Sequence, residues 1–178
     1  YNALNEALER YARGRVFSDI GCYTLGALEP FNAINTCVDM GASITMAKGA
    51  ADTGLVPAVA VIGDSTFTHS GMTGLLDAVI SKTPITVMIL DNETTAMTGG
   101  QRSNARSRLE SICLGLGVEE DHLHVINPIQ KNHDENMAVI KNELEYEGVS
   151  VIIPRRECLQ TLAKRIRDEK KKVKPAIQ

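Results

Sequence analysis

The sequence predicts an α/β fold in three layers, with helices covering both faces of a mostly parallel sheet. Strand-like and helix-like segments alternate along the chain, which is typical of right-handed βαβ crossovers. The strand-like segments 59–62 and 85–90 are apolar throughout, as expected for strands that are buried on both faces. A chain of 178 residues with 43% apolar residues is long enough to bury a substantial core. Together these observations favour an α/β domain.

The individual elements follow from the spacing of apolar residues and from the glycines and prolines between them. Residues 21–39 form an irregular stretch that Gly21, Gly26 and Pro30 punctuate. The segment 40–53 is rich in small residues, so its helix can pack closely against a sheet or a second copy of the chain, and we expect a homodimer. Strands are expected over 15–20, 57–62, 85–90, 122–126 and 149–153, and helices over 2–12, 40–53, 70–82, 104–116, 133–146 and 155–171.

Composition argues against several classes of protein. The formal net charge is −3, only 4% of residues are aromatic and there is no Trp, so we expect no nucleic-acid partner. No apolar run approaches the roughly 18 residues that a membrane helix needs, so we expect no membrane association. The cysteines at 22, 37, 113 and 158 show no C-x-x-C pairing, so neither a disulfide framework nor an iron–sulfur site is expected in this chain. Reduced thiols favour a cytoplasmic location.

The C-terminal segment differs in charge from the rest of the chain. From Arg155 onward, nine Lys or Arg residues stand against three acidic residues. This composition is compatible with a solvated final helix and linker, or with a docking surface for an acidic partner. We expect one domain over 1–163, followed by a basic helix end and linker over 164–178 that leads to a further domain. The chain starts at Tyr1 rather than Met, from which we expect a piece of a longer protein.

Oxygen-bearing side chains follow two of the expected strands at the point where each strand ends. Asp64 comes after the strand 57–62, and Asn92 follows the strand 85–90. One helical crossover fits between them, so both side chains should arrive at the carboxyl edge of the sheet, where Asp19 also falls. A carboxylate, an amide oxygen and the Thr94 carbonyl suit Mg²⁺, which takes its remaining ligands from phosphates and water. Gly63 leaves space for a phosphate, and the turn that begins at Ser65 and Thr66 offers backbone N–H groups to an anion.

Two other interpretations of this pattern were weighed. Gly-Asp and Asp-Asn pairs are common turn residues after strands, but the spacing of these two pairs and the Thr98–Gln101 stretch favour a site. A Walker loop or a Gly-x-Gly-x-x-Gly fingerprint would be the usual alternative phosphate site in an α/β sheet, and the sequence contains neither.

The motifs resemble those of a known family. Gly63-Asp64, a spacer and Asn92 resemble the motif that binds thiamine diphosphate. The segments 63–71 (GDSTFTHSG) and 90–101 (LDNETTAMTGGQ) are similar to the 2-oxoacid:ferredoxin oxidoreductases. Within that family, the segments 19–26 (DIGCYTLG) and 37–44 (CVDMGASI) are most similar to the α subunit of the indolepyruvate branch. The resemblance extends over residues 15–160, in four motifs in the right order. It implies a thiamine diphosphate-binding fold and the C-terminal domain of that subunit.

The resemblance also implies a role for individual residues. Asp64, the Asn92 side chain and the Thr94 carbonyl would hold Mg²⁺ against the diphosphate of the cofactor. The cofactor itself would be lined by four short segments. These are Gly21, Cys22, Tyr23 and Thr24 after the first strand; Met40, Gly41 and Ala42 under the cofactor rings; Gly63, Ser65 and Thr66 at the diphosphate; and Met97, Thr98 and Gly99 over the metal.

Several residues depart from the family pattern or leave alternatives open. Ser65 replaces a glycine of the motif, which leaves the metal ligand intact and adds a hydroxyl near the phosphate. Glu29-Pro30 stands where two prolines are expected, which puts the course of that loop in doubt. Cys22 is either a thiolate nucleophile or a small residue packed against the cofactor, and Cys37 is assigned to the core. His69 either acts on the substrate as a catalytic residue or serves a capping or surface role.

The function implied by the resemblance is oxidative decarboxylation of a 2-oxoacid, with indolepyruvate as the expected aryl substrate. The partners would be the 2-oxoacid, coenzyme A, ferredoxin, a companion pyrimidine-binding domain and a second subunit. Iron–sulfur clusters and the acid that activates the aminopyrimidine are expected in those other parts, so the chain alone should be inactive. Two alternatives stay open: a non-redox decarboxylase subunit of the sulfopyruvate type, and a non-catalytic Mg²⁺-dependent assembly module.

Overall fold

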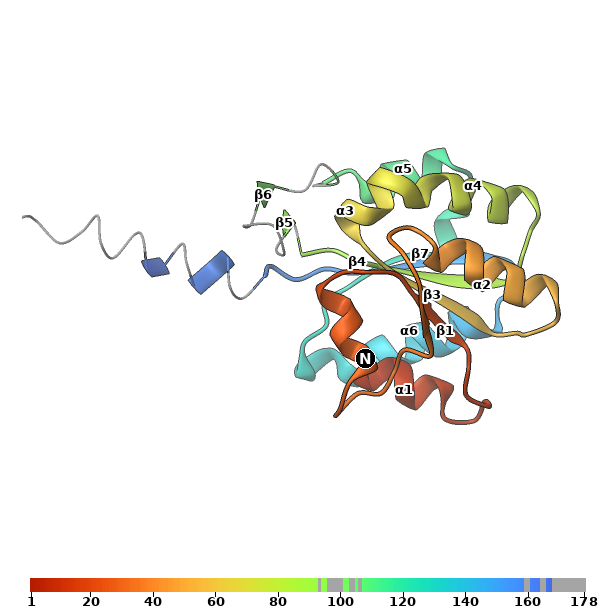
Figure 1. Cartoon of the computed structure of the whole chain (residues 1–178), viewed down its shortest axis with the longest axis horizontal. Helices are drawn as coiled ribbons and strands as arrows, with labels where there is room; N and C mark the ends of the chain where they lie inside the picture. The colour runs from red at the N-terminus through yellow and green to blue at the C-terminus, as the bar shows by residue number, and fades with distance from the viewer. Residues whose placement is uncertain are drawn as a thin grey trace, which may run out of the picture.

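A six-stranded parallel sheet forms the centre of the molecule (Figure 1). The computed structural model describes residues 1–92, 94, 95, 101, 102, 105, 107–158, 161–163, 166 and 167. The strands stand in the order β2-β1-β3-β4-β8-β7, and every neighbouring pair is parallel. Their bounds are Val16–Ser18 (β1), Thr36–Cys37 (β2), Ala58–Gly63 (β3), Ile85–Leu90 (β4), Leu123–Ile126 (β7) and Val149–Pro154 (β8).

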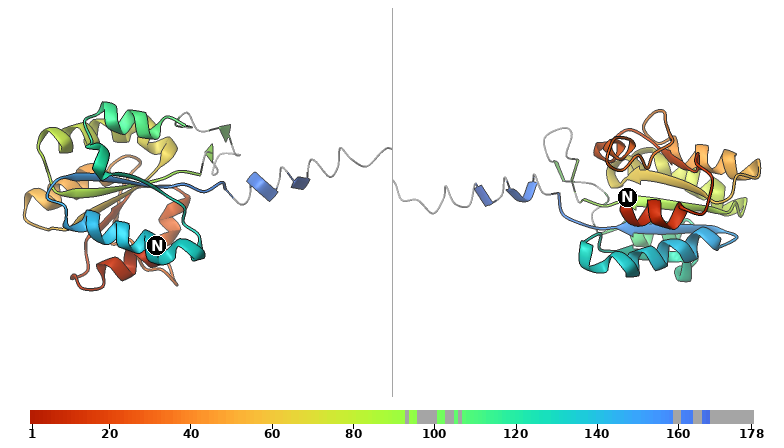
Figure 2. Two further views of the ribbon diagram at one scale, coloured as in Figure 1. Left: turned by 180° about the vertical axis from the view of Figure 1, so that it is seen from behind. Right: turned by 90° about the horizontal axis from the view of Figure 1, so that it is seen from below.

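Helices cover both faces of this sheet, which confirms the predicted three-layer α/β class (Figures 1 and 2). One face carries α2 (Ser43–Asp52), α4 (Met72–Ile80) and α5 (Leu109–Gly115). The other carries α1 (Asn2–Leu8) and α6 (His133–Glu145), which pack against each other. Shorter elements complete the described chain: η1 (Cys22–Ala27), α3 (Asp64–Thr66), η2 (Phe67–Gly71), β5 (Thr94–Thr95), β6 (Gln101–Arg102), η4 (Glu120–His122) and η5 (Gln130–Asn132).

The central strands divide their side chains between two hydrophobic cores. In β3, Ala58, Ala60 and Ile62 belong to the core under α2, α4 and α5, whereas Val59 and Val61 belong to the core under α1 and α6. The same alternation runs through β4 and β8, because successive side chains of a strand point to opposite faces. All six residues of β3 are buried, which explains why this segment is apolar throughout.

The small residues of the segment 40–53 are used within the chain. Ala47 and Ala51 of α2 are buried against the sheet. Where α2 meets α4, a Cβ atom added to Gly74 would lie 3.1 Å from Thr45 Cγ2, so the two helices approach closely at that glycine. The expected homodimer stays a prediction.

The structure corrects the expected elements at several points. The stretch 21–39, expected to be irregular, contains the 3₁₀ helix η1 and the short edge strand β2. The helix expected over 70–82 is preceded by α3 and the π-helical turn η2, so helical backbone begins directly at Asp64. The helix expected from residue 155 is wrong at its start, because Arg155 extends the sheet by bridging to Asp91 and residues 156–158 are not helical. Helical residues occur at 161–163, 166 and 167.

Three histidines without motif spacing each pair with a carboxylate in the fold. Both oxygens of the buried Glu143 carboxylate are engaged, by His122 Nδ1 at 2.9 Å and by His124 Nε2 at 2.7 Å. His133 Nε2 lies 3.0 Å from Glu6 Oε2 and so links α6 to α1. Across the described residues, no helix is both long and apolar enough to span a lipid bilayer.

Candidate cofactor-binding site

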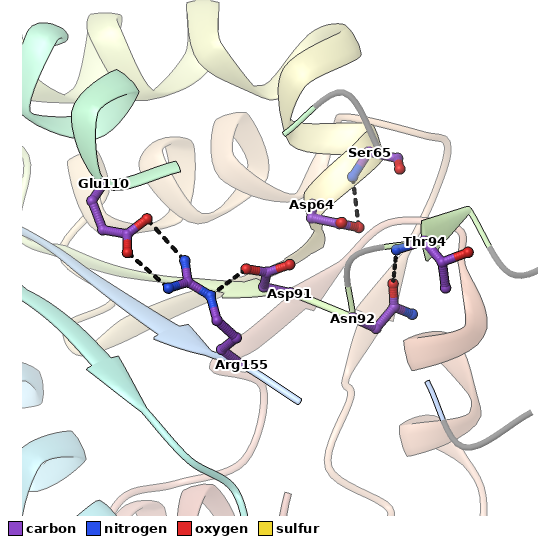
Figure 3. A network of polar contacts seen from close by, with 7 residues as sticks. All are labelled: Asp64, Ser65, Asp91, Asn92, Thr94, Glu110 and Arg155. Atoms are coloured by element: carbon purple, nitrogen blue, oxygen red, sulfur yellow. Dashed lines mark hydrogen bonds and ion pairs between the residues drawn. The ribbon is translucent and has the colours of Figure 1, made fainter. Parts of the chain in front are cut away.

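The ends of β3 and β4 bring Asp64 and Asn92 to the same edge of the sheet, as the spacing predicts. The register pairs Gly63 with Leu90, so Asp64 and Asp91 follow directly from neighbouring positions. The Asp64 side chain is buried, at 3% exposure, and its Oδ1 accepts a hydrogen bond of 2.8 Å from the Ser65 N–H (Figure 3). An aspartate with so little contact with water requires polar or cationic neighbours, because burying a carboxylate alone is costly.

The second part of the site is a turn that brings Thr94 back to Asn92. The Thr94 N–H donates a hydrogen bond of 3.1 Å to Asn92 Oδ1, and Thr94 is itself buried (Figure 3). Asn92 is half-buried, and both residues line the same cavity as Asp64. An ionised carboxylate, an amide oxygen and a backbone carbonyl form a donor set made only of oxygen. That set fits Mg²⁺, which prefers oxygen ligands and completes its shell with phosphates and water.

Tyr23 covers the two glycines that line this part of the cavity. A Cβ atom added to Gly63 would lie 2.7 Å from Tyr23 Cε1, and one added to Gly21 would lie 2.2 Å from the same atom. Glycine is therefore required at both positions for the tyrosine ring to lie where it does. The chain after Gly63 turns at once into α3, so Ser65 and Thr66 stand in a first helical turn beside Asp64.

A buried aspartate, Asp19, organises the neighbouring loops. Asp19 is fully buried at the end of β1, where its Oδ1 accepts a hydrogen bond from the Tyr23 hydroxyl. Its Oδ2 accepts hydrogen bonds of 3.0 Å from the Gly41 N–H and of 3.0 Å from the Ser43 hydroxyl. Burial raises the pKa of Asp19 above its ordinary value, although the hydrogen bonds from Tyr23, Ser43 and Gly41 oppose that increase. The sequence placed Asp19 at this edge, but its hydrogen bonds depend on tertiary contacts.

A cavity of about 720 Å³ extends from the strand ends to the space between α1 and α6. Most of the predicted cofactor and metal residues line it. The described lining includes Gly21, Cys22, Tyr23, Met40, Gly63, Asp64, Ser65, Thr66, Asn92 and Thr94. Residues that sequence reasoning did not anticipate line the far end, including Tyr1, Leu4, Ile126, His133 and Ile140. These residues are distant in sequence from every motif, so only the fold brings them to the site.

Other predicted site residues lie outside the described lining of this cavity. Thr24 instead accepts a hydrogen bond of 2.9 Å from the Gly21 N–H. Gly41 has a φ of +95°, and a Cβ atom there would lie 2.1 Å from Ser70 Oγ, so this position requires glycine for backbone reasons. Ala42 forms the N-cap of α2, and His69 is exposed in η2. The roles assigned to these four residues stay predictions, and Met97, Thr98 and Gly99 lie outside the described residues.

Comparison with known proteins identifies the family. A family model described as "Thiamine pyrophosphate enzyme, C-terminal TPP binding domain" matches residues 19–153. The chain belongs to this family. The match begins just after β1 and covers β2, β3, β4, β7 and all of β8 but its last residue, together with Asp64 and Asn92. It confirms the family expected from the motifs.

Curated relatives point to one branch of that family. The chain is 34% identical over 169 residues to the indolepyruvate oxidoreductase subunit IorA of Archaeoglobus fulgidus, a match that covers 89% of this chain and 26% of the relative. It is 36% identical over 165 residues to the subunit of the same name from Pyrococcus horikoshii, covering 79% of this chain and 25% of the relative. The chain thus spans about a quarter of the length of these relatives.

Solved structures confirm the fold of a thiamine diphosphate-dependent enzyme. A 2-oxoglutarate:ferredoxin oxidoreductase from Magnetococcus marinus superposes with a TM-score of 0.69 at 17% identity, covering 88% of this chain and 60% of that chain. Benzoylformate decarboxylase from Polynucleobacter necessarius superposes with a TM-score of 0.65 at 18% identity, covering 87% of this chain and 32% of that chain.

Proposed function

We propose that this chain is the Mg²⁺–thiamine diphosphate-binding domain of a 2-oxoacid:ferredoxin oxidoreductase of the indolepyruvate type. The complete enzyme would convert an aryl 2-oxoacid to its acyl-CoA and pass the electrons to ferredoxin. The observation that carries the proposal is the placement of Asp64, Asn92 and Thr94 at the ends of adjacent strands, lining one cavity. The identity to subunits named IorA supports the choice of branch.

Each part of the site has a task in binding. Asp64, Asn92 and the Thr94 carbonyl would hold Mg²⁺, while Gly63, Ser65 and Thr66 would face the diphosphate. When bound, thiamine diphosphate supplies the nucleophilic carbon and the electron sink for loss of CO₂. The apolar walls of the cavity, from residues such as Leu4, Val61 and Ile140, would keep water from the reacting atoms.

Exposed apolar side chains beside the cavity support a companion domain at this edge. The large apolar residues with high exposure include six between residues 20 and 40, and three of these six also line the cavity. Ile20, Phe31 and Met40 line the cavity, and the other three are Leu25, Leu28 and Val38. Such a concentration is typical of an interface, and we propose that the pyrimidine-binding domain packs there. Leu28→Asp, at a position that is 60% exposed, should break that association without unfolding the chain.

Electrons from the reaction would leave through other parts of the enzyme. Cys22, Cys37 and Cys113 form no disulfide, and within the described ranges no three His, Cys, Asp or Glu side chains are grouped as metal ligands. We therefore propose that the iron–sulfur clusters belong to other domains or to the second subunit.

The test uses calorimetry to measure the affinity of thiamine diphosphate for the chain together with its companion domain. Asp64→Asn should remove Mg²⁺-dependent binding, whereas the matched control Asp121→Asn, at an exposed aspartate before β7, should bind as the wild type does. Binding that needs neither Mg²⁺ nor Asp64 would refute the site. Decarboxylation that proceeds fully without coenzyme A or an electron acceptor would favour the non-redox alternative.

A further inference from the structure

One arginine, Arg155, holds both ends of the chain segment that carries Thr94. Arg155 follows β8, and its Nε donates a hydrogen bond of 2.6 Å to Asp91 Oδ2. Its Nη1 and Nη2 donate hydrogen bonds of 2.8 Å each to the two carboxylate oxygens of Glu110 (Figure 3). Asp91 directly precedes Asn92, and Glu110 lies in the first turn of α5. A single guanidinium therefore joins the two ends of residues 92–109.

The backbone around Arg155 is itself fixed by the sheet. The Arg155 N–H donates to the Ile126 carbonyl at 2.9 Å, which ties it to β7. The Asp91 N–H donates to the Pro154 carbonyl at 3.0 Å, and the Arg156 N–H donates to the Asp91 carbonyl at 2.9 Å. The first bond continues the β7–β8 pairing, and the other two continue the backbone contact between β4 and β8 past the last strand residues. The guanidinium thus extends from a rigid base rather than from a free terminal helix.

The three charges form a compact group in which each donor has an acceptor. The Asp91 side chain is 1% exposed and that of Arg155 is 30% exposed, so the pair is shielded from water on the aspartate side. The planar guanidinium makes a bidentate contact with the Glu110 carboxylate, a geometry that arginine favours. The hydrogen bond from Arg155 lowers the pKa of Glu110. A lysine at position 155 would keep the charge but could not bond both acids in this geometry.

We propose that Arg155 is a positioning residue for the metal site, with Asp91 and Glu110 as its anchors. The inference rests on the proposed function and deepens it. Because Asp91 is held and directly precedes Asn92, the Asn92 side chain loses less conformational freedom when Asn92 and Thr94 take up a cation. Residues that orient metal ligands from outside the coordination shell change metal affinity by about 10- to 100-fold when they are replaced.

The experiment is a Mg²⁺ titration of thiamine diphosphate binding and of turnover, in the chain assembled with its companion domain and second subunit. Arg155→Lys should raise the Mg²⁺ concentration for half-saturation by about 10- to 100-fold. The kcat at saturating Mg²⁺ should stay near the wild-type value, because the positioned ligands are still present. Glu110→Gln, which keeps one acceptor, should give a smaller shift in the same direction. Lys48→Met is the matched control, since it removes an ion pair of 2.8 Å with Asp52 in α2, away from the site.

The outcomes separate this inference from the proposed function. If the wild type binds thiamine diphosphate without Mg²⁺, the proposed metal site is wrong, whatever Arg155 does. If the wild type needs Mg²⁺ but Arg155→Lys and Glu110→Gln match its half-saturation, the positioning role is wrong. A lower kcat with unchanged Mg²⁺ half-saturation overturns it as well. Should Arg155→Lys fail to fold, as judged by circular dichroism, the Glu110→Gln titration decides.

Discussion

The hydrogen bond from the Tyr23 hydroxyl to the buried Asp19 carboxylate should make a measurable and pH-dependent contribution to stability. Tyr23→Phe keeps the ring over Gly63 and removes the hydroxyl, which donates to Asp19 Oδ1 and lies 3.2 Å from the Ile20 carbonyl oxygen. The other oxygen keeps its bonds from Gly41 and Ser43. A hydrogen bond to a charged group contributes about 1.5–3 kcal/mol. The variant should therefore lose about 2 kcal/mol of unfolding free energy near neutral pH, and the pKa of Asp19 should rise because a donor to its ionised form is gone.

The pH dependence of this loss follows from the direction of the pKa shift. Burial already raises the pKa of Asp19 above its ordinary value, so the folded state favours the protonated acid. The pKa of Tyr23 is also raised by burial, so its hydroxyl remains a donor throughout the accessible range. The donor stabilises the ionised form of Asp19 and its removal raises the pKa further. The loss should be full above the raised pKa of the variant and should shrink as the pH falls through it and then through the pKa of Asp19 in the folded wild type.

Urea denaturation followed by circular dichroism, from pH 8 to pH 4, measures this effect. Tyr11→Phe is the matched control, because its hydroxyl accepts a hydrogen bond of 2.7 Å from the exposed Arg10 side chain at the surface, and the variant should change stability by less than about 0.5 kcal/mol. A loss in Tyr23→Phe that is equal at pH 8 and at the acid end would refute the reasoning, since an uncharged acceptor would then account for it.

Three further predictions concern a glycine at the end of β3, the hydrophobic core, and the dependence of stability on acid pH. Gly63→Ala should cost about 1–3 kcal/mol in urea denaturation, because the new Cβ would lie 2.7 Å from Tyr23 Cε1; an unchanged midpoint would contradict the close approach. Leu75→Ala, at a fully buried position in α4, should lower stability by about 2–5 kcal/mol in thermal unfolding, and a loss below that range would show that the core closes around the cavity. The hydrogen bond from Arg155 lowers the pKa of Glu110 below 4.5, so their contact stabilises the fold fully above pH 4.5. This stabilisation is lost as the pH falls through the lowered pKa of Glu110 in the folded state. Acid unfolding of Glu110→Gln should therefore depend less steeply on pH in that window, and identical profiles would exclude this contribution.

The sheet edge that carries Asp64 and Asn92 could be predicted from the sequence because its signals are local. The strands β3 and β4 are continuous apolar runs that end at Gly63 and Leu90, next to Asp64 and Asn92. A buried strand flanked by turn residues is the pattern that sequence reading identifies best. Parallel pairing then places both polar ends at one edge without further information.

The remaining features depend on contacts between distant residues. The strand β2 has only two residues, Thr36 and Cys37, which is too short for any periodicity. Arg155 belongs to a basic run whose pattern predicts a helix. In the fold its backbone pairs with the sheet, and its side chain donates hydrogen bonds to Asp91 and Glu110. Asp19 likewise looks like an ordinary strand end, and only the approach of Gly41 and Ser43 shows that it joins two loops.

The strand order has a consequence for the sequence of events during synthesis. The strand β4 lies between β3, which precedes it by one helical crossover, and β8, which leaves the ribosome some sixty residues later. Until β8 has emerged, one edge of β4 has no partner. The β4–β8 pairing, which joins the paired strands that lie farthest apart in the sequence, cannot yet form. The same event delivers Arg155 to Asp91 and Glu110. Folding of the nascent domain and completion of its cofactor edge should therefore coincide, so a chain that ends before β8 would expose an unpaired central strand together with an incomplete site.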